Sequence, residues 1–253
     1  MTLEEIDNLL ETTLKDLCAL PEQRMRLHLL GRRLSGIDPD DIAVFFNQLY
    51  KKNSQLKPVR QFKDILVNHD GITQTLGEES CKRIYMSSIK LGLDRISRLF
   101  TDLPPKKKGF SGYDNEEDGP MELITLGQRR SMAKSTEKNT LDRLLNDPDP
   151  LVISYVLDNP RIIEKDILKI ASKRPNSPRI LKLIAGHRKW SKRYAVIKAI
   201  VLNPYTQPRI SVALLDMLLT QDLADIARDK TVHPQVKLSA KDIVEFRFGN
   251  GVK

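Results

Sequence analysis

Residues 152–160 read VISYVLDNP, and residues 196–204, 44 positions later, read VIKAIVLNP. Both copies end in an Asn-Pro pair, at Asn159 and at Asn203. A weaker echo supports them, because Ile184-Ala185 returns as Ile226-Ala227 after 42 residues. A period in the forties, made of short apolar segments that end at proline, is typical of α-helical repeat proteins.

Prolines divide the second half of the chain into short segments. The segment that begins at Pro150 resembles the one that begins at Pro234, 84 residues later, which is about two of these periods. Proline lacks the amide donor and disfavours helix at the residue before it, so each proline marks a break between short helices. No segment alternates apolar and polar residues long enough to require a strand. We therefore predict an all-α protein.

The first half of the chain also has helical periodicity. Apolar residues predict a helix over 3–19, and Asp38 before Pro39 predicts a capped helix start. We expect one long helix over about 78–100. Residues 102–122 lack an apolar period and are rich in Pro, Gly, Lys and acids, which predicts a linker or surface loop. The expected organisation is an N-terminal helical domain (1–101), the linker (102–122) and a repeat array (123–253).

Positive charge is concentrated within the array. The chain has a net charge of +9, but residues 161–209 alone hold thirteen Lys and Arg against two acids, Glu164 and Asp166. The remainder of the chain is slightly acidic. Such asymmetry indicates an anionic partner, either an acidic protein surface or a nucleic acid.

The candidate binding residues lie inside this block. Lysines 165, 169 and 173 are spaced to share one helix face, and residues 187–194 hold the only Trp beside four cations and a Tyr. Trp and Tyr offer stacking faces, and Lys and Arg offer charge. The alternative is that the two aromatic rings pack between helices and the cations are solvated. The predicted site comprises Lys165, Lys169, Lys173, Arg174, Arg188, Lys189, Trp190, Lys192, Arg193 and Tyr194.

Other residue patterns favour a protein without catalytic or cofactor chemistry. The four histidines are scattered, so we expect no metal site, and the sequence contains no nucleophile-elbow, phosphate-loop or dinucleotide motif. We expect no cofactor and no enzymatic activity. Asn159 and Asn203 are expected to cap neighbouring backbone groups.

Cysteine use and hydropathy suggest a compartment. The two cysteines, Cys18 and Cys81, have no metal or redox spacing, which fits a reducing environment. The acidic start does not resemble a signal peptide, and no apolar run reaches the length of a membrane span. We expect a cytoplasmic protein that does not enter the membrane.

The segment LLNDPDPLV at 144–152, followed by LDNP at 157–160, resembles the leucine-rich-repeat-variant family and its HEAT-like relatives. The resemblance covers about residues 126–244 and implies a right-handed solenoid of short helices. Founding variant-repeat proteins carry a cysteine-bound iron–sulfur cluster, but this chain has no cysteine cluster, so that feature does not transfer. The end of the chain, with Asn203-Pro204-Tyr205-Thr206, is also similar to uncharacterised bacterial repeat proteins.

Three functions follow from these patterns, in descending order of support. The first is a non-enzymatic helical scaffold that binds an acidic protein partner. The second is sequence-tolerant binding of nucleic acid through residues 161–209. The third comes from a resemblance to HEAT-like DNA glycosylases, in which Trp190 and a nearby acid would act together.

Overall fold

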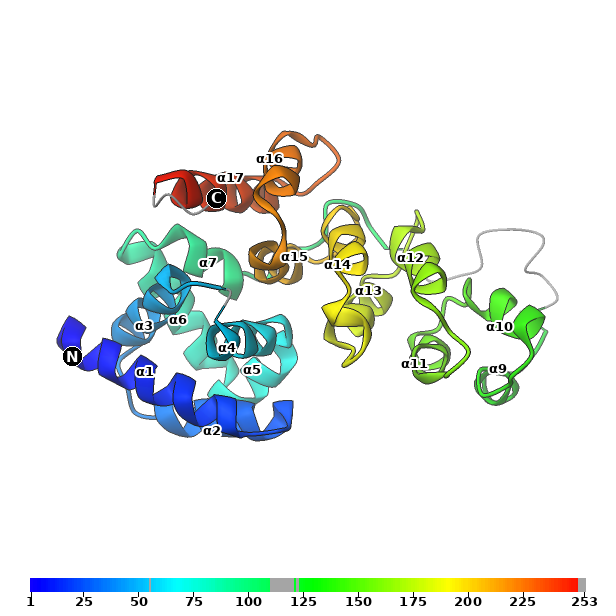
Figure 1. Cartoon of the computed structure of the whole chain (residues 1–253), viewed down its shortest axis with the longest axis horizontal. Helices are drawn as coiled ribbons and strands as arrows, with labels where there is room; N and C mark the ends of the chain where they lie inside the picture. Colours follow the sequence, from blue (N-terminus) through cyan, green and yellow to red (C-terminus); the bar gives the residue numbers. More distant parts are fainter. Residues whose placement is uncertain (55, 110–120, 122, 250–253) are drawn as a thin grey trace.

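All regular secondary structure is helical in the computed structural model, which describes residues 1–54, 56–109, 121 and 123–249 (Figure 1). The all-α prediction is therefore confirmed for this part of the chain. The first half contains α1 (Leu3–Ala19), α2 (Gln23–Leu34), α3 (Pro39–Lys51), α4 (Lys57–Val67), α5 (His69–Leu76), α6 (Glu78–Lys90) and α7 (Asp94–Phe100).

Phenylalanine rings form the centre of these N-terminal helices. The Phe46 ring lies 5.6 Å from Phe45, 6.3 Å from Phe62 and 5.4 Å from Phe100, measured between ring centroids. All four rings are buried, and they come from α3, α4 and α7. Edge-to-face and tilted ring pairs at these distances stabilise a core beyond the area that they bury.

Helix starts were predicted better than helix ends. Helix α1 has the expected bounds, and the Asp38 carboxylate accepts the Asp40 N–H at 2.9 Å, which confirms the predicted cap. The single helix expected over 78–100 is wrong. Helix α6 ends at Lys90, and Gly92 adopts a φ of +65°, a conformation that side chains rarely allow, so the chain turns before α7 begins.

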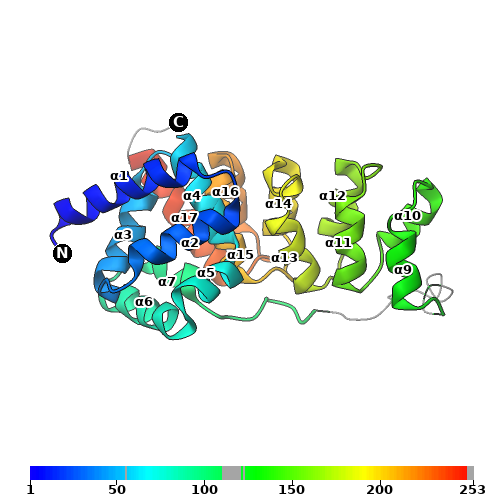
Figure 2. The same ribbon diagram turned by 90° about the horizontal axis from the view of Figure 1, so that it is seen from below.

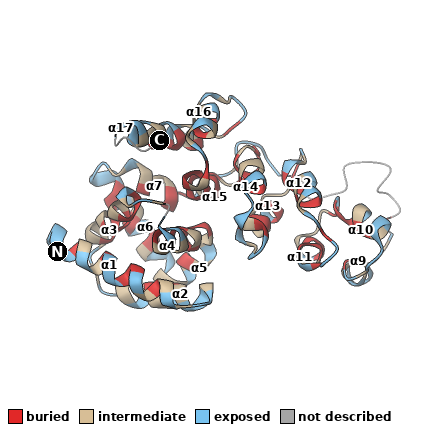
Figure 3. Cartoon of the chain, viewed as in Figure 1, coloured by how far each residue is buried: buried red, intermediate tan, exposed pale blue. Residues whose placement is uncertain are grey.

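The second half forms a row of helix pairs. Its elements are α9 (Leu126–Met132), α10 (Lys138–Leu144), α11 (Pro150–Asp158), α12 (Glu164–Ser172), α13 (Pro178–Gly186), η2 (Trp190–Lys192), α14 (Tyr194–Val201), α15 (Pro208–Leu214), η3 (Leu215–Met217), α16 (Thr220–Arg228) and α17 (Pro234–Gly249). The pairs α9/α10, α11/α12 and α13/α14 stand side by side (Figure 2). Helix α11 packs on α9 and α13, and α12 packs on α14. Buried residues face the space between neighbouring helices (Figure 3).

The helix pairs recur at a shorter interval than the sequence echo suggested. Prolines begin every second α-helix from α11 onwards, at Pro150, Pro178, Pro208 and Pro234, with intervals of 28, 30 and 26 residues. The period of 42–44 residues is therefore wrong. The echo relates α11, the first helix of its pair, to α14, the second helix of the next pair. The 84 residues from Pro150 to Pro234 therefore cover three of these intervals, and not two of the predicted periods.

The two Asn-Pro motifs nevertheless play the same local role. The Asn159 side-chain amide donates to the carbonyls of Ala133 and Ser135, both at 2.8 Å, just beyond the end of α9. The Asn203 amide donates to the carbonyls of Ala171 and Lys173, at 2.8 and 3.1 Å, at the end of α12. Both side chains are buried. Each asparagine therefore satisfies free helix-end carbonyls of the preceding pair, as the sequence predicted.

The segment after α7 runs along the row as far as Gly109, which lies against Pro178 at the start of α13 (Figure 2). The Lys107 N–H donates to the Pro204 carbonyl at 3.1 Å, and the Lys106 ammonium donates to the carbonyls of Lys230 and Val232. The first part of the expected linker is therefore bound to the array by hydrogen bonds. Residues 110–120 and 122 lie outside the described residues. Helix α9 stands at the end of the row far from the N-terminal helices, and α15 packs on α4 and α7, so the row leads back towards the N-terminal helices (Figure 2).

A buried ion cluster lies where the row meets the N-terminal helices. Helix α15 packs on α4 and α7, and α17 packs on α7. The Asp216 carboxylate of η3 lies 3.2 Å from the Lys63 ammonium and also pairs with Arg95. Lys63 is only 2% exposed. Burial by itself would raise the pKa of Asp216, but Arg95 and Lys63 outweigh it and hold that pKa below its usual value.

We expect Asn203→Ala to lower the free energy of unfolding by about 2 kcal/mol, because the substitution leaves buried carbonyls without a donor. Urea unfolding followed by circular dichroism measures the change. Asn139→Ala is the matched control, since Asn139 is exposed on α10, and it should change stability by less than about 0.5 kcal/mol. Equal effects of the two substitutions would contradict the capping role.

We expect Asp216→Asn to cost about 3–5 kcal/mol, because it leaves the buried Lys63 ammonium without a full countercharge. The same urea experiment tests this expectation. Asp225→Asn is the control, because Asp225 is exposed on α16. A loss below about 1 kcal/mol for Asp216→Asn would show that the cluster does not hold the two halves together.

Candidate anionic-partner interface

Two adjacent loops at one edge of the row, with the first turn of α12, carry most of the exposed cations of residues 161–209. One loop joins α11 to α12, and the other leads from α13 through η2 to α14. The exposed cations of these loops and of the first turn of α12, which we call the loop patch, are Arg161, Lys165, Arg188, Lys189, Lys192 and Arg193. The N-termini of α12 and α14 lie at the same edge, and their partial positive charge adds to that of the side chains.

Two acids lie within this edge, and each already has a partner. The Asp158 carboxylate is 3.2 Å from the His187 imidazole, and the Glu164 carboxylate is 3.9 Å from the Arg193 guanidinium. Six cations therefore face two acids. The resulting surface is positive, and it attracts anions most strongly at low ionic strength.

Trp190 is the anchor of the loop patch and is not part of its surface. The ring is 1% exposed, and its Nε1–H donates to the Leu157 carbonyl at 2.8 Å. The Lys189 ammonium lies 4.0 Å from the ring centroid, and the His187 ring stacks at 6.3 Å. Trp190 therefore matches the alternative prediction, in which the ring packs between helices. The prediction that the Trp190 ring stacks on a partner is wrong. Burial and the hydrogen bond fix the loop from which the neighbouring cations project.

Tyr194 links two helices of the row. Its hydroxyl donates to the Asp222 carboxylate on α16 and accepts the Leu219 N–H at 3.2 Å. Lys198 also binds Asp222, at 2.9 Å. Hydrogen bonds from Tyr194 and Lys198 hold the pKa of Asp222 below its usual value. Although the ring is 38% exposed, its hydroxyl is occupied by this contact between α14 and α16.

The remaining predicted residues follow α12 away from the loop patch. Lys169 is exposed on the helix. At the opposite edge, the Lys173 ammonium donates to the Asn146 carbonyl at 3.4 Å, and the Arg174 guanidinium donates to the Leu202 carbonyl at 2.8 Å. These two cations therefore bind helix-end carbonyls, where positive charge is favourable. The structure brings five of the ten predicted residues to one edge: Lys165, Arg188, Lys189, Lys192 and Arg193.

The glycosylase hypothesis required Trp190 and an acid to face a common space. Trp190 is buried, and the Asp166 carboxylate is bound by the Lys138 ammonium at 2.7 Å and by the Ile163 N–H at 3.2 Å. Glu164 is paired with Arg193. The geometry therefore does not present an indole and a free carboxylate together at the surface.

Sequence reasoning missed a second cationic group. On α9 the Arg130 guanidinium donates to the Tyr155 hydroxyl of α11 at 2.8 Å, and it lies 5.1 Å from the ring centroid. The Lys134 ammonium lies 5.0 Å from the same centroid. The hydrogen bond from Arg130 lowers the pKa of Tyr155. The sequence shows that Arg130 and Lys134 are four residues apart. Their proximity to Tyr155, however, depends on how α9 packs against α11.

Neither a metal-binding cluster nor a membrane-spanning helix is found in the described part of the chain. No three His, Cys, Asp or Glu side chains gather there in a way that could hold a metal ion. None of the described helices combines the length and the apolar character that crossing a bilayer requires. Comparison of the chain with protein-family models, with curated proteins and with solved structures finds no match.

We expect Trp190→Ala to destabilise the protein by about 3–5 kcal/mol, since it removes a fully buried indole. By contrast, Arg188→Ala should change stability by less than about 0.5 kcal/mol, because Arg188 is exposed in the same loop. Urea unfolding of both variants measures the difference. A Trp190→Ala protein as stable as the wild type would mean that the indole does not anchor the loop patch.

Proposed function

We propose that the protein is a non-enzymatic helical scaffold that binds an acidic protein partner. The proposal includes a right-handed, HEAT-like or variant-repeat solenoid over residues 123–253 and a cytoplasmic location. The observation that carries it is the loop patch, in which six exposed cations face only two acids, both already paired. A packed indole beneath the loop keeps these cations in place before any partner arrives, which lowers the entropic cost of binding.

The same observation favours an acidic protein over single-stranded nucleic acid. Sequence-tolerant binding of single strands combines positive charge with aromatic faces on which bases stack. The loop patch has the charge, but its Trp ring is buried, so that of its two predicted stacking rings it presents only Tyr194, which is 38% exposed. Binding the carboxylates of a protein partner requires positive charge and hydrogen-bond donors but no stacking ring, and exposed Arg and Lys supply both.

A titration with labelled probes tests the proposal. Fluorescein-labelled poly-glutamate and mixed-sequence single- and double-stranded oligonucleotides are titrated by anisotropy at about 50 and about 200 mM salt. We expect poly-glutamate to bind, and K189E/K192E/R193E to weaken this binding at least about tenfold, because like charges then face the probe.

A charge-matched variant controls for overall charge. The substitutions K51E/K57E/K82E change net charge equally at exposed lysines of α3, α4 and α6, and they should leave the affinity nearly unchanged. Tighter binding of an oligonucleotide, with a steep salt dependence that the loop-patch variant abolishes, would replace the acidic partner with nucleic acid. Failure of every probe at the lower salt concentration would refute both.

A further inference from the structure

Helix α2 presents an unusual charge pattern outside the array. It contains Arg24, His28 and Arg32 at spacings of four residues, so they share one face, and all three are exposed. The helix itself contains no acid. Neither arginine therefore has an oppositely charged residue three or four positions away within α2, so ion pairs inside the helix do not account for this row.

The other two arginines of α2 are engaged in structural contacts. The Arg26 guanidinium donates to the Leu20 carbonyl at 2.7 and 2.9 Å, and Arg33 pairs with Asp16. Within the residues that the structure describes, no such contact is seen for Arg24, His28 or Arg32. Two cations therefore hold the helix in place, while the exposed row faces outwards.

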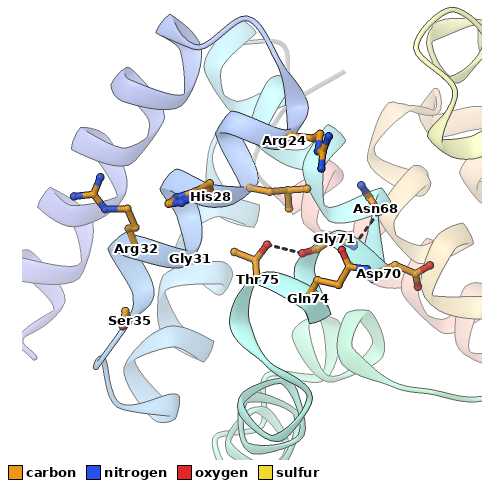
Figure 4. Close-up of a pocket in the computed structure, with 11 residues that line it drawn as sticks. Arg24, His28, Gly31, Arg32, Ser35, Asn68, Asp70, Gly71, Gln74 and Thr75 are labelled. Atoms are coloured by element: carbon orange, nitrogen blue, oxygen red, sulfur yellow. Dashed lines mark hydrogen bonds between the residues drawn. The ribbon is translucent and has the colours of Figure 1, made fainter.

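A groove follows this row on the side of α5. It has a volume of about 700 Å³, and Arg24, His28 and Arg32 line one side, with Asn68, Asp70, Gln74 and Thr75 on the other (Figure 4). The Asp70 carboxylate is paired with Lys182, and the Arg32 side chain points away from α5. Two glycines let the helices approach closely. A side chain at Gly31 would overlap Thr75, and a side chain at Gly71 would overlap Leu27. The width and floor of the groove therefore depend on these glycines.

The opposite flank of α2 is hollowed as well and is more apolar. A second groove, of about 480 Å³, is lined by Leu20, Met25 and Leu29 together with Arg24, His28 and Arg32. Met25 is 46% exposed, although it belongs to an ordered helix. Helix α2 thus forms a ridge that carries two arginines and a histidine along its crest and apolar side chains along one flank.

We propose that α2 is the docking surface for an acidic amphipathic helix of a protein partner. In a helix, residues four apart are separated by about 6 Å along the axis, so carboxylates at this spacing match Arg24, His28 and Arg32 in turn. Leu or Met side chains beside those carboxylates would enter the groove of Met25 and Leu29. Charge complementarity selects the partner, and the grooves favour a helix over an extended chain.

This surface is separate from the loop patch, although the two are neighbours. The Gln23 side chain at the start of α2 donates to the Asp64 carbonyl at 3.3 Å. Burial raises the pKa of Asp64, and the positive charge of Lys192 in the loop patch opposes that rise. A partner could therefore cover both surfaces, but the helix-docking proposal stands without the loop patch. It goes beyond the scaffold function by specifying the form that the partner takes.

A designed peptide tests the proposal with the full chain. The probe is a helix-stabilised, fluorescein-labelled peptide with Glu at every fourth position and Leu beside each Glu. Its control has the same composition in permuted order, so that the acids form no row. We expect the first peptide to bind at least about tenfold more tightly than the permuted one, and R24E/R32E to remove this preference. M25S should weaken the first peptide and leave the permuted peptide unchanged.

Two controls separate this proposal from the loop patch. The variant R188E/K189E has the same charge change in the loop patch and should retain the preference for the ordered peptide. Hydrogen exchange should show new protection over α2 and α5 when that peptide is bound. Equal affinity for both peptides, or protection confined to residues 187–193, would overturn the proposal. Preferential binding of the wild type, but not of R24E/R32E, to anionic phospholipid vesicles would overturn it in favour of a lipid surface.

Discussion

The buried carboxylate of Asp216 is the centre of the charged contact between the two halves of the protein. It lies at the end of the row, in η3, and it is surrounded by Lys63 of α4 and Arg95 of α7. A buried charge is tolerated only when partners compensate for lost hydration. Because each partner comes from a different helix, removal of any one leaves an uncompensated charge inside the protein. The cluster therefore favours one docking geometry, in which α15 packs on α4 and α7 and α17 packs on α7.

Several cations of the chain bind carbonyls at the ends of helices. Short helices leave many terminal carbonyls without intrahelical donors, and this protein has many short helices. Asn159 and Asn203 satisfy some of these carbonyls, and Lys173 and Arg174 satisfy others. The array is therefore basic partly for structural reasons. Positive net charge by itself overstates the surface that remains for a partner.

The basic residues that remain exposed for a partner lie on two neighbouring surfaces with different shapes, the loop patch and the ridge of α2. The loop patch consists of exposed side chains on two loops held by a buried indole, which suits an irregular acidic segment. The ridge of α2 is a regular row between two grooves, which suits a helix. Together they describe a protein that would bind acidic partners by charge and select among them by shape.

The sequence by itself determined the helical class, several helix starts, the capping role of two asparagines and the location of the basic block. These are local properties: proline geometry, apolar spacing and side chains that reach nearby backbone groups. It predicted part of the candidate site, since five of ten residues lie together. Only the tertiary structure decided that Trp190 faces inwards, that Lys173 and Arg174 bind carbonyls, and that α2 forms a ridge. Those outcomes depend on contacts between residues far apart in the chain, such as Trp190 with Leu157 and Gly31 with Thr75, and no local pattern encodes them.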